Sequence, residues 1–172
     1  MAAFAGMVTV PQIALPSVNR GLGEYRSLSL FNDRTAERVS TVYWIDGEYI
    51  PEALEPINHI LRDWRADQPT EMDVRILDIL SATQKLLDVN EPFEIVSGFR
   101  TKETNAMLRS RSRAVARKSY HCLGMAVDVA LKSRSVAQIS GAGRSLSAGG
   151  VGKYSRAQFV HLDSGPVRGW GR

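Results

Sequence analysis

Two of the three histidines in the chain lie in short motifs that together carry the ligand types of an open zinc site. The segment 119–128 reads SYHCLGMAVD and the segment 159–163 reads FVHLD, so they contain His121, Asp128 and His161. Catalytic zinc has three protein ligands and keeps a fourth position for water, and it binds imidazole nitrogen and carboxylate oxygen at about 2.0–2.2 Å. We therefore predict that these three residues bind one zinc ion per chain. Two imidazoles and one carboxylate also suit other divalent ions.

The sequence around the motifs predicts how these side chains are positioned. A glycine three residues after His121 permits a crowded backbone, and residues 126–131 then alternate small or polar with apolar side chains, as a strand does. Residues 158–163 also read as a short strand, in which His161 and Asp163 project from the same face. A loop and two strands would then deliver the metal ligands, with Asp163 beside one of them.

Arg100 lies at a predicted junction between a strand and a helix. Residues 92–96 read as a short strand, and residues 101–109 read as a helix with Thr101 as its N-cap. A guanidinium there can form a paired hydrogen bond to a substrate carboxylate, or face the oxyanion that builds up during amide hydrolysis. The alternative is a salt bridge to a nearby carboxylate.

The rest of the pattern predicts one α+β domain. Alternating segments at 25–31 and 38–44 predict a β-hairpin. Helices are predicted over 51–64, 73–87 and 133–146. Strands and helices that do not alternate regularly favour a single domain in which helices flank a small antiparallel sheet, with the zinc site at the sheet.

Four motifs carry a resemblance to a known family. They are SGFR at 97–100, the motif at 119–128, GGVG at 149–152 and FVHLDSGPVRGW at 159–170. With these motifs in this order, residues 25–170 resemble the YcbK-like branch of the D-Ala-D-Ala zinc metallopeptidases, whose fold is hedgehog-like. The resemblance implies a murein endopeptidase that hydrolyses peptide crosslinks of bacterial peptidoglycan, with metal ligands that match His121, Asp128 and His161.

Two other functions stay open beside this one. A D,D-carboxypeptidase or dipeptidase would keep the zinc and act on free D-Ala-D-Ala termini. A catalytically degenerate module would bind peptidoglycan without cleaving it. Many relatives carry a glutamate three residues before the last histidine ligand, where this chain has Gln158, and glutamine cannot carry a proton.

Four further residues are candidates for the site. Relatives use the arginine that matches Arg100, so we expect a catalytic role for it. Asp163 is the best remaining carboxylate for a general base, although it could instead orient an imidazole. Ser119 could bond to a residue behind the ligands or cap a turn, and Tyr154 could donate to an oxyanion or pack against its neighbours.

Composition and charge limit the partners. A chain of 172 residues with a net charge of +4 fits one basic domain. Seven lysines and arginines fall between residues 100 and 118, and this basic patch suits an anionic polymer. Because no interleaved aromatic residues or binding motif accompany the charges, we expect peptidoglycan stem peptides as the partner and no nucleic acid. A solvated helix face is the alternative.

Two other reactive side chains are expected to lie outside the site. Cys122 is next to a predicted ligand, but a zinc thiolate normally comes with more cysteines, and we interpret it as a small buried filler. His59 lies off the apolar stripe of its helix and is expected at the surface.

Residues 1–22 are predicted to form an N-terminal arm, and residues 23–172 the zinc metallopeptidase domain. The first nineteen residues carry no charge, and their apolar stretch is too short for a membrane span. They look like the end of a secretory signal whose basic start is missing. We therefore expect export to the periplasm or cell envelope and no membrane insertion of the mature form. A disordered or packed arm is the alternative.

Overall fold

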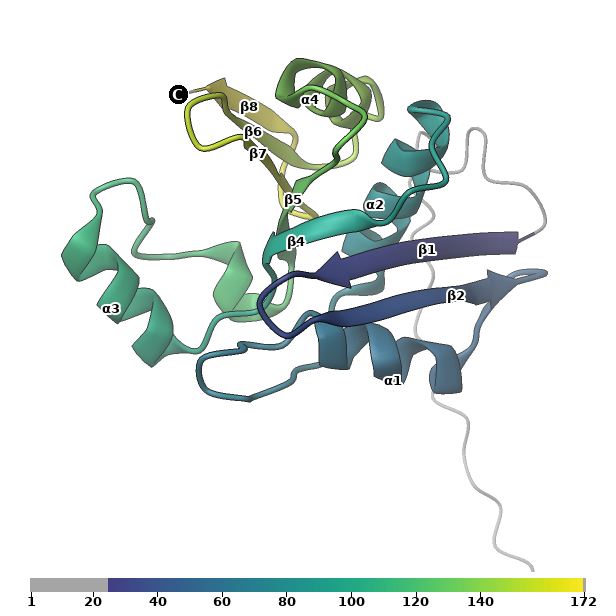
Figure 1. Ribbon diagram of the computed structural model, residues 1–172, viewed down its shortest axis with the longest axis horizontal. Coiled ribbons are helices and arrows are strands. Elements are labelled where there is room, and N and C mark those ends of the chain that lie inside the picture. The colour runs from purple at the N-terminus through teal and green to yellow at the C-terminus, as the bar shows by residue number, and fades with distance from the viewer. Residues whose placement is uncertain (1–24, 172) are drawn as a thin grey trace, which may run out of the picture.

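The computed structural model describes residues 25–171, which fold around one eight-stranded sheet (Figure 1). The strands are β1 (Tyr25–Asn32), β2 (Glu37–Ile45), β3 (Glu48–Tyr49), β4 (Phe93–Ser97), β5 (Ala126–Ala130), β6 (Gly150–Tyr154), β7 (Phe159–Asp163) and β8 (Arg168–Gly171). Their order across the sheet is β3-β2-β1-β4-β5-β7-β6-β8. The predicted N-terminal arm at 1–22 lies outside the described residues.

The single α+β domain is confirmed, but the sheet is larger than predicted and it is mixed. β1 runs parallel to β4 and β6 runs parallel to β8, whereas the other neighbours are antiparallel. The predicted hairpin is present as β1 and β2. The expectation of a small antiparallel sheet was wrong because the chain passes through α1 and α2 before it returns as β4, beside β1 and in the same direction. Strand β8 was also not expected, since glycine at alternate positions removes the apolar alternation that marks a strand.

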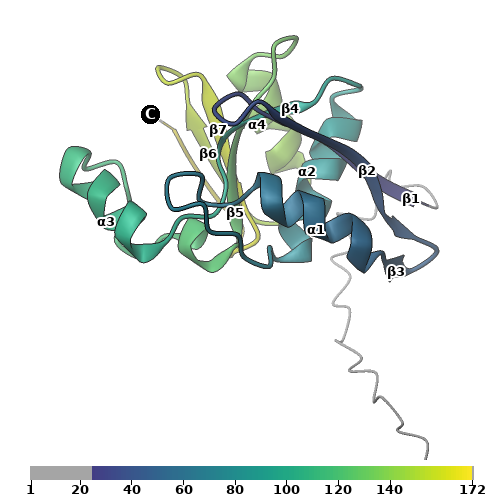
Figure 2. The same ribbon diagram turned by 60° about the horizontal axis from the view of Figure 1, so that its bottom comes forward.

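Four α-helices accompany the sheet in the described part of the chain. They are α1 (Pro51–Ile60), α2 (Val74–Leu86), α3 (Lys102–Arg111) and α4 (Val136–Ser145), and a 3-10 turn, η1, spans Tyr120–Leu123. Helices α1, α2 and α4 pack against the strands, whereas α3 stands apart beyond them (Figures 1 and 2). No helix within residues 25–171 is long and apolar enough to cross a membrane.

The helix boundaries follow their caps. Asp73 and Thr101 each accept a backbone N–H from the first turn of α2 and α3, as predicted. Ser135 forms a capping box, so α4 begins three residues later than predicted. Helix α1 ends at Ile60, and the prediction that it continues to Trp64 was wrong because the chain turns back there through a bridge between residues 63 and 68.

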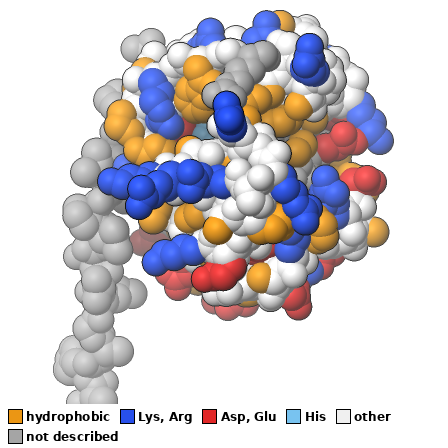
Figure 3. Space-filling view, turned by 90° about the vertical axis from the view of Figure 1, so that its left-hand side faces the viewer, with side chains coloured by type: hydrophobic (Ala, Val, Ile, Leu, Met, Phe, Trp, Pro, Cys, Tyr) orange, Lys and Arg blue, Asp and Glu red, His pale blue; other side chains and the backbone are white. Residues whose placement is uncertain are grey.

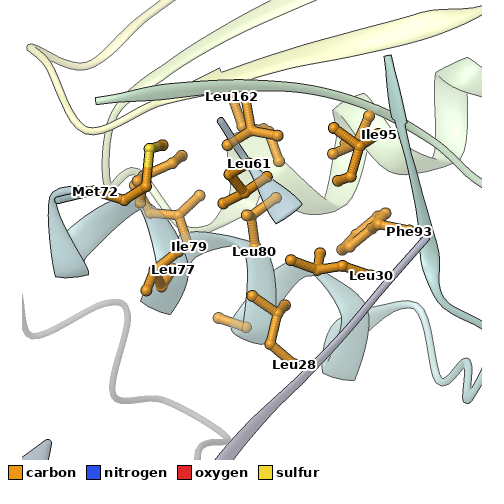
Figure 4. Packing of buried hydrophobic residues seen from close by; sticks show 14 of the residues in the cluster. Leu28, Leu30, Leu61, Met72, Leu77, Ile79, Leu80, Phe93, Ile95 and Leu162 are labelled. Carbon is orange, nitrogen blue, oxygen red and sulfur yellow. The ribbon is translucent and has the colours of Figure 1, made fainter. Parts of the chain in front are cut away.

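Strand β7 separates the apolar core from the opposite face of the sheet. Val160 and Leu162 are fully buried in the core, where Leu162 lies near Leu61 and Leu80 (Figure 4). Each such side chain contributes about 1.5–3 kcal/mol by leaving water. Side chains alternate along a strand, so the other residues of β7, which include His161, project from the opposite face. The candidate site forms on that face.

Candidate metal centre

The candidate site lies along one row of residues that crosses four strands. Asp128 of β5 pairs with His161 of β7, His161 with Gly152 of β6, and Gly152 with Trp170 of β8. Residues paired in this way project from the same face, which here is the face opposite the core. His121 reaches the row from η1. The predicted ligands thus come together although forty positions separate the two histidines.

Three donor atoms of these residues form a compact triangle. His121 Nε2 lies 3.1 Å from His161 Nδ1 and 3.2 Å from Asp128 Oδ1, and the last two atoms are 2.8 Å apart. A tetrahedral ion with bonds of about 2.0–2.2 Å holds its ligand atoms roughly 3.3–3.6 Å apart. The three side chains are buried, and a small outward movement of each would admit a metal ion. The donor set therefore fits a catalytic zinc site with an open position.

The outer nitrogen of each imidazole has a hydrogen-bond partner. His121 Nδ1 lies 2.7 Å from the carbonyl oxygen of Gly98, to which it donates, and His161 Nε2 lies 2.9 Å from Asp163 Oδ2. A donor bond from one ring nitrogen fixes the tautomer and leaves the other nitrogen for a metal. When both rings are neutral, each can therefore aim a lone pair at the triangle.

The charges of the triangle are set by burial and by mutual contact. Burial lowers the pKa of His121, so this ring is neutral near pH 7. Burial would also lower the pKa of His161, but hydrogen bonds to Asp128 and Asp163 raise this pKa to about 9. Burial would raise the pKa of Asp128, yet the two imidazoles hold it well below its ordinary value. Without a metal, His161 therefore carries a proton that a bound cation would replace.

Asp163 lies behind His161 and is saturated with hydrogen bonds. Its Oδ2 accepts from His161 Nε2 and from Arg168 Nη2 at 2.7 Å, and its Oδ1 accepts from Arg168 Nη1 and from the backbone N–H groups of Gly165 and Gly150. Burial would raise the pKa of Asp163, but His161 and Arg168 lower it to about 2. The carboxylate is fully buried and bonds to the edge of His161 that points away from the other donors.

Two glycines of β6 let side chains of β8 cross over to β7. Gly150 pairs with Arg168, and Gly152 pairs with Trp170. A Cβ on Gly152 would lie 2.5 Å from the Trp170 indole, and a Cβ on Gly150 would clash with the Arg168 guanidinium and with Asp163 Oδ2. The indole lies over Gly152, with its centroid 5.3 Å from that of the His161 ring. We call Arg168 and Trp170 the β8 clamp.

Arg100 contacts a predicted ligand directly. Its Nη2 donates to Asp128 Oδ2 at 2.6 Å and its Nε donates to Ser97 Oγ at 2.7 Å, while its backbone N–H bonds to the carbonyl of His121. The salt bridge considered as an alternative is therefore present. Arg100 also lines the cleft over the site, so its catalytic role stays a prediction.

The segment that carries Arg100 is held from its other side by the corner after α1. Phe99 donates its N–H to the carbonyl of Leu61 at 2.7 Å, and Asp63 accepts both the N–H and the hydroxyl of Thr101 at 2.9 Å. Asp63 is only 1% exposed. This buried carboxylate fixes the junction between β4 and α3.

A cleft of about 680 Å³ opens over the triangle. One wall is the segment between α3 and η1, and the other is made by the aromatic residues Tyr154, Phe159 and Trp170. Tyr154 stacks on Phe159 with centroids 4.5 Å apart, and its hydroxyl accepts a hydrogen bond from Trp170 Nε1 at 3.1 Å. Ser119 also lines the cleft, and its side chain makes no capping hydrogen bond to η1.

Three residues weighed from sequence lie away from the triangle. Gln158 is exposed in the turn before β7, where its amide donates to the carbonyl of Ser155. His59 is exposed and lies 3.3 Å from Glu37, as expected for a surface residue. Cys122 is half-buried rather than buried, and burial raises the pKa of its thiol.

The β8 clamp and Asp63 were not identified from sequence. Arg168 and Trp170 lie inside a recognised motif, and their spacing of two matches the spacing of Gly150 and Gly152. That match could have suggested paired strands, but only the register shows it. Asp63 carries no local signal, because its partner lies 38 positions further along the chain.

The chain is similar over most of its length to proteins named as peptidoglycan endopeptidases. Residues 21–170 match the family model described as "Peptidoglycan L,D-endopeptidase MepK". The protein of that name from Escherichia coli K12 is 39% identical over 166 residues, which are 96% of this chain and 89% of that protein. A "Probable peptidoglycan L,D-endopeptidase MepK" from Haemophilus influenzae is 35% identical over 146 residues, which cover 84% of this chain and 78% of that protein.

Proposed function

The chain belongs to the MepK family of peptidoglycan L,D-endopeptidases, and from that premise we propose that it cleaves an L,D peptide bond of peptidoglycan with zinc bound to His121, Asp128 and His161. It is a metallopeptidase that hydrolyses peptide bonds of murein. The observation that carries the proposed ligand set is the buried triangle of two imidazole nitrogens and one carboxylate oxygen. Zinc in such a site supplies an activated water and a Lewis acid for the scissile carbonyl.

Each ligand is supported by a residue behind it. Gly98 holds His121, Asp163 holds His161, and Arg100 holds the outer oxygen of Asp128. We propose that these contacts fix the donor atoms in place before the metal binds, because partners of this kind orient ligands and raise metal affinity.

Arg100 and Tyr154 are the proposed donors to the substrate. Two nitrogens of the Arg100 guanidinium are committed to Ser97 and Asp128, which leaves Nη1 at the cleft. The Tyr154 hydroxyl accepts from Trp170, so its own hydrogen is free to donate into the cleft. Either group can stabilise the oxyanion that develops on the scissile carbonyl.

Asp163 is proposed as a positioning residue rather than the general base. All of its hydrogen bonds go to protein donors, and it does not line the cleft. Gln158 is not proposed as a substitute, because its side chain bonds within an exposed turn. Gln158→Glu should therefore change the rate less than about twofold.

The ligand set is tested by removing one imidazole at a time. His121→Ala and His161→Ala should each lose zinc and activity, whereas the matched control His59→Ala should keep both. Elemental analysis of the three purified variants measures the metal. Full zinc occupancy in both ligand variants would overturn the assignment.

The bond that is cleaved is tested by product analysis. Zinc-loaded protein is incubated with purified muropeptides crosslinked through L,D bonds or through D,D bonds, and the products are identified by mass. We expect cleavage of the L,D crosslink. Release of terminal D-Ala alone would favour the carboxypeptidase function, and binding without hydrolysis at full zinc occupancy would favour the wall-binding module.

Because its substrate is peptidoglycan, we propose that the protein works in the cell envelope. Fractionation of cells that produce the full chain should recover it outside the cytoplasm. Recovery with the cytoplasmic fraction alone would contradict this location.

A further inference from the structure

The cleft has one strongly basic edge whose charges are not neutralised by any carboxylate within residues 25–171. The segment 109–118 runs from the last turn of α3 to the residue before Ser119, and it carries five cations and no acidic residue. We call it the basic rim. Its cations are Arg109, Arg111, Arg113, Arg117 and Lys118, all of them exposed.

The cations of the basic rim differ from the arginines of the site. Arg100 and Arg168 each bond to a buried aspartate, so their charges are already paired. Among the described residues, no carboxylate lies within salt-bridge distance of any cation of the basic rim. Figure 3 views the side of the molecule on which α3 lies, and lysine and arginine side chains surround the hydrophobic patch there.

The basic rim is built into the wall of the cleft. Ser112, the residues 114–116 and Lys118 line it together with the candidate ligands. Asn105 of α3 donates its side-chain N–H to the carbonyl of Ala116 at 3.1 Å, and the hydroxyl of Ser112 accepts the N–H of Ala114. The rim is thus attached to α3. Its Lys118 lines the cleft, and Arg113 and Arg117 are exposed next to residues that line it.

The opposite wall has a different chemistry. Tyr154, Phe159 and Trp170 offer aromatic surface, and the only carboxylate that lines the described cleft is Asp128, which is occupied by Arg100 and the histidines. A peptide lying between the walls would contact rings on one side and Lys118 on the other, with the exposed Arg113 and Arg117 on the same segment. Free cations beside a cleft with one paired carboxylate attract anionic groups.

We propose that the basic rim binds the free carboxylates of peptidoglycan stem peptides and makes the enzyme select acidic stem peptides over amidated ones. This selectivity rests on the proposed function, because it concerns the substrate of the same site. Each exposed ion pair is worth about 0.2–1 kcal/mol, which corresponds to roughly 1.4-fold to fivefold in affinity. Several pairs together should give a preference of about tenfold or more.

The experiment compares one crosslinked muropeptide with its fully amidated counterpart. Zinc-loaded wild-type protein should cleave the acidic form with at least about tenfold higher kcat/KM, mainly through a lower KM. The preference should shrink as salt is raised, because about 0.1 M salt already screens exposed charges beyond ~10 Å. Equal kcat/KM values for the two substrates would overturn the proposal.

Variants of the rim complete the test. A triple variant with Arg113→Gln, Arg117→Gln and Lys118→Gln should lose most of the preference and keep its zinc and its kcat. The single change Lys118→Gln should raise KM for the acidic form by roughly twofold to fivefold, and Lys118→Arg should restore it. The matched control Lys85→Gln, at the far end of α2, should change neither value.

The outcomes separate this proposal from the proposed function. Cleavage of both substrates with equal efficiency, or a preference that survives in the triple variant, refutes selection by the rim and leaves the endopeptidase in place. Failure of the zinc-loaded wild type to cleave either substrate refutes the proposed function. In that case binding of the two muropeptides, measured by calorimetry, still tests the rim, and equal affinities would overturn it.

Discussion

Replacing Asp163 by asparagine tests whether this carboxylate holds His161 in place or takes a proton from water. The amide group cannot satisfy the donors that meet Oδ2, since both His161 Nε2 and Arg168 Nη2 donate to that atom. An amide NH₂ in the same position would face two donors. If the amide oxygen takes that place instead, the NH₂ faces the N–H groups that now bond to Oδ1.

The expected magnitude follows from these contacts. Loss of the partner of a ligating imidazole weakens metal affinity by about 10–100-fold. Unsatisfied donors cost about 1–3 kcal/mol of folding free energy, and we take the lower part of that range because solvent screens the Arg168 side chain, which is 38% exposed. The melting temperature should fall by about 2–4 °C for each kcal/mol.

The assay measures zinc dissociation with a competing chelator, turnover at saturating zinc, and thermal unfolding on the same preparation. Asp163→Asn should bind zinc more weakly and recover most of its turnover when zinc is in excess. The control Asp73→Asn keeps an N-cap but removes the carboxylate that pairs with Arg75, and it should lower stability slightly without changing zinc affinity. Wild-type zinc affinity together with a rate loss of about 10²–10⁴ would refute the reasoning and make Asp163 the general base.

Three further outcomes are expected. Arg100→Lys should still bind zinc, because an ammonium can pair with Asp128, but it should lower turnover sharply, because the planar fork that also faces the cleft is lost; unchanged kinetics on muropeptides would remove Arg100 from the site. In metal-free protein the pKa of His161 is raised to about 9, so its proton stabilises the fold fully below about pH 6.5 and this contribution is lost as pH rises through about 9. Zinc uptake at pH 7 should accordingly release about one proton, seen by calorimetry in buffers of different ionisation enthalpy, and zero release would contradict the protonated state. Gly152→Ala should displace Trp170, because a Cβ would meet the indole at 2.5 Å, and should lower stability by about 1–3 kcal/mol; an unchanged melting temperature would show that the ring can move freely.

The three residues of the triangle could be brought together from sequence as proposed ligands because each lies in a short motif with local structure of its own. The alternation of β7 correctly placed His161 and Asp163 on one face, and the predicted caps of α2 and α3 are present. These features depend on neighbours a few positions away. The local pattern of residues is therefore enough to predict them.

The surroundings of the ligands depend on contacts between distant segments, and sequence did not reveal them. The bond from Arg168 to Asp163 requires that β8 lie parallel to β6 in one particular register. The hydrogen bonds from Thr101 to Asp63 require the corner after α1 to meet the start of α3. The prediction for Arg100 left a salt bridge open without naming its partner, since strand order decides that the partner is Asp128.

The β8 clamp also links choices of residue at positions that are not adjacent in the chain. An indole at 170 can lie against His161 only while position 152 has no side chain, and a guanidinium at 168 requires the same of position 150. Relatives should therefore vary at 152 and 170 as a pair, with a larger residue in β6 accompanied by a smaller one in β8. Position 150 is more restricted, because a side chain there would also meet the carboxylate of Asp163, so a smaller residue at 168 would not by itself make room for it.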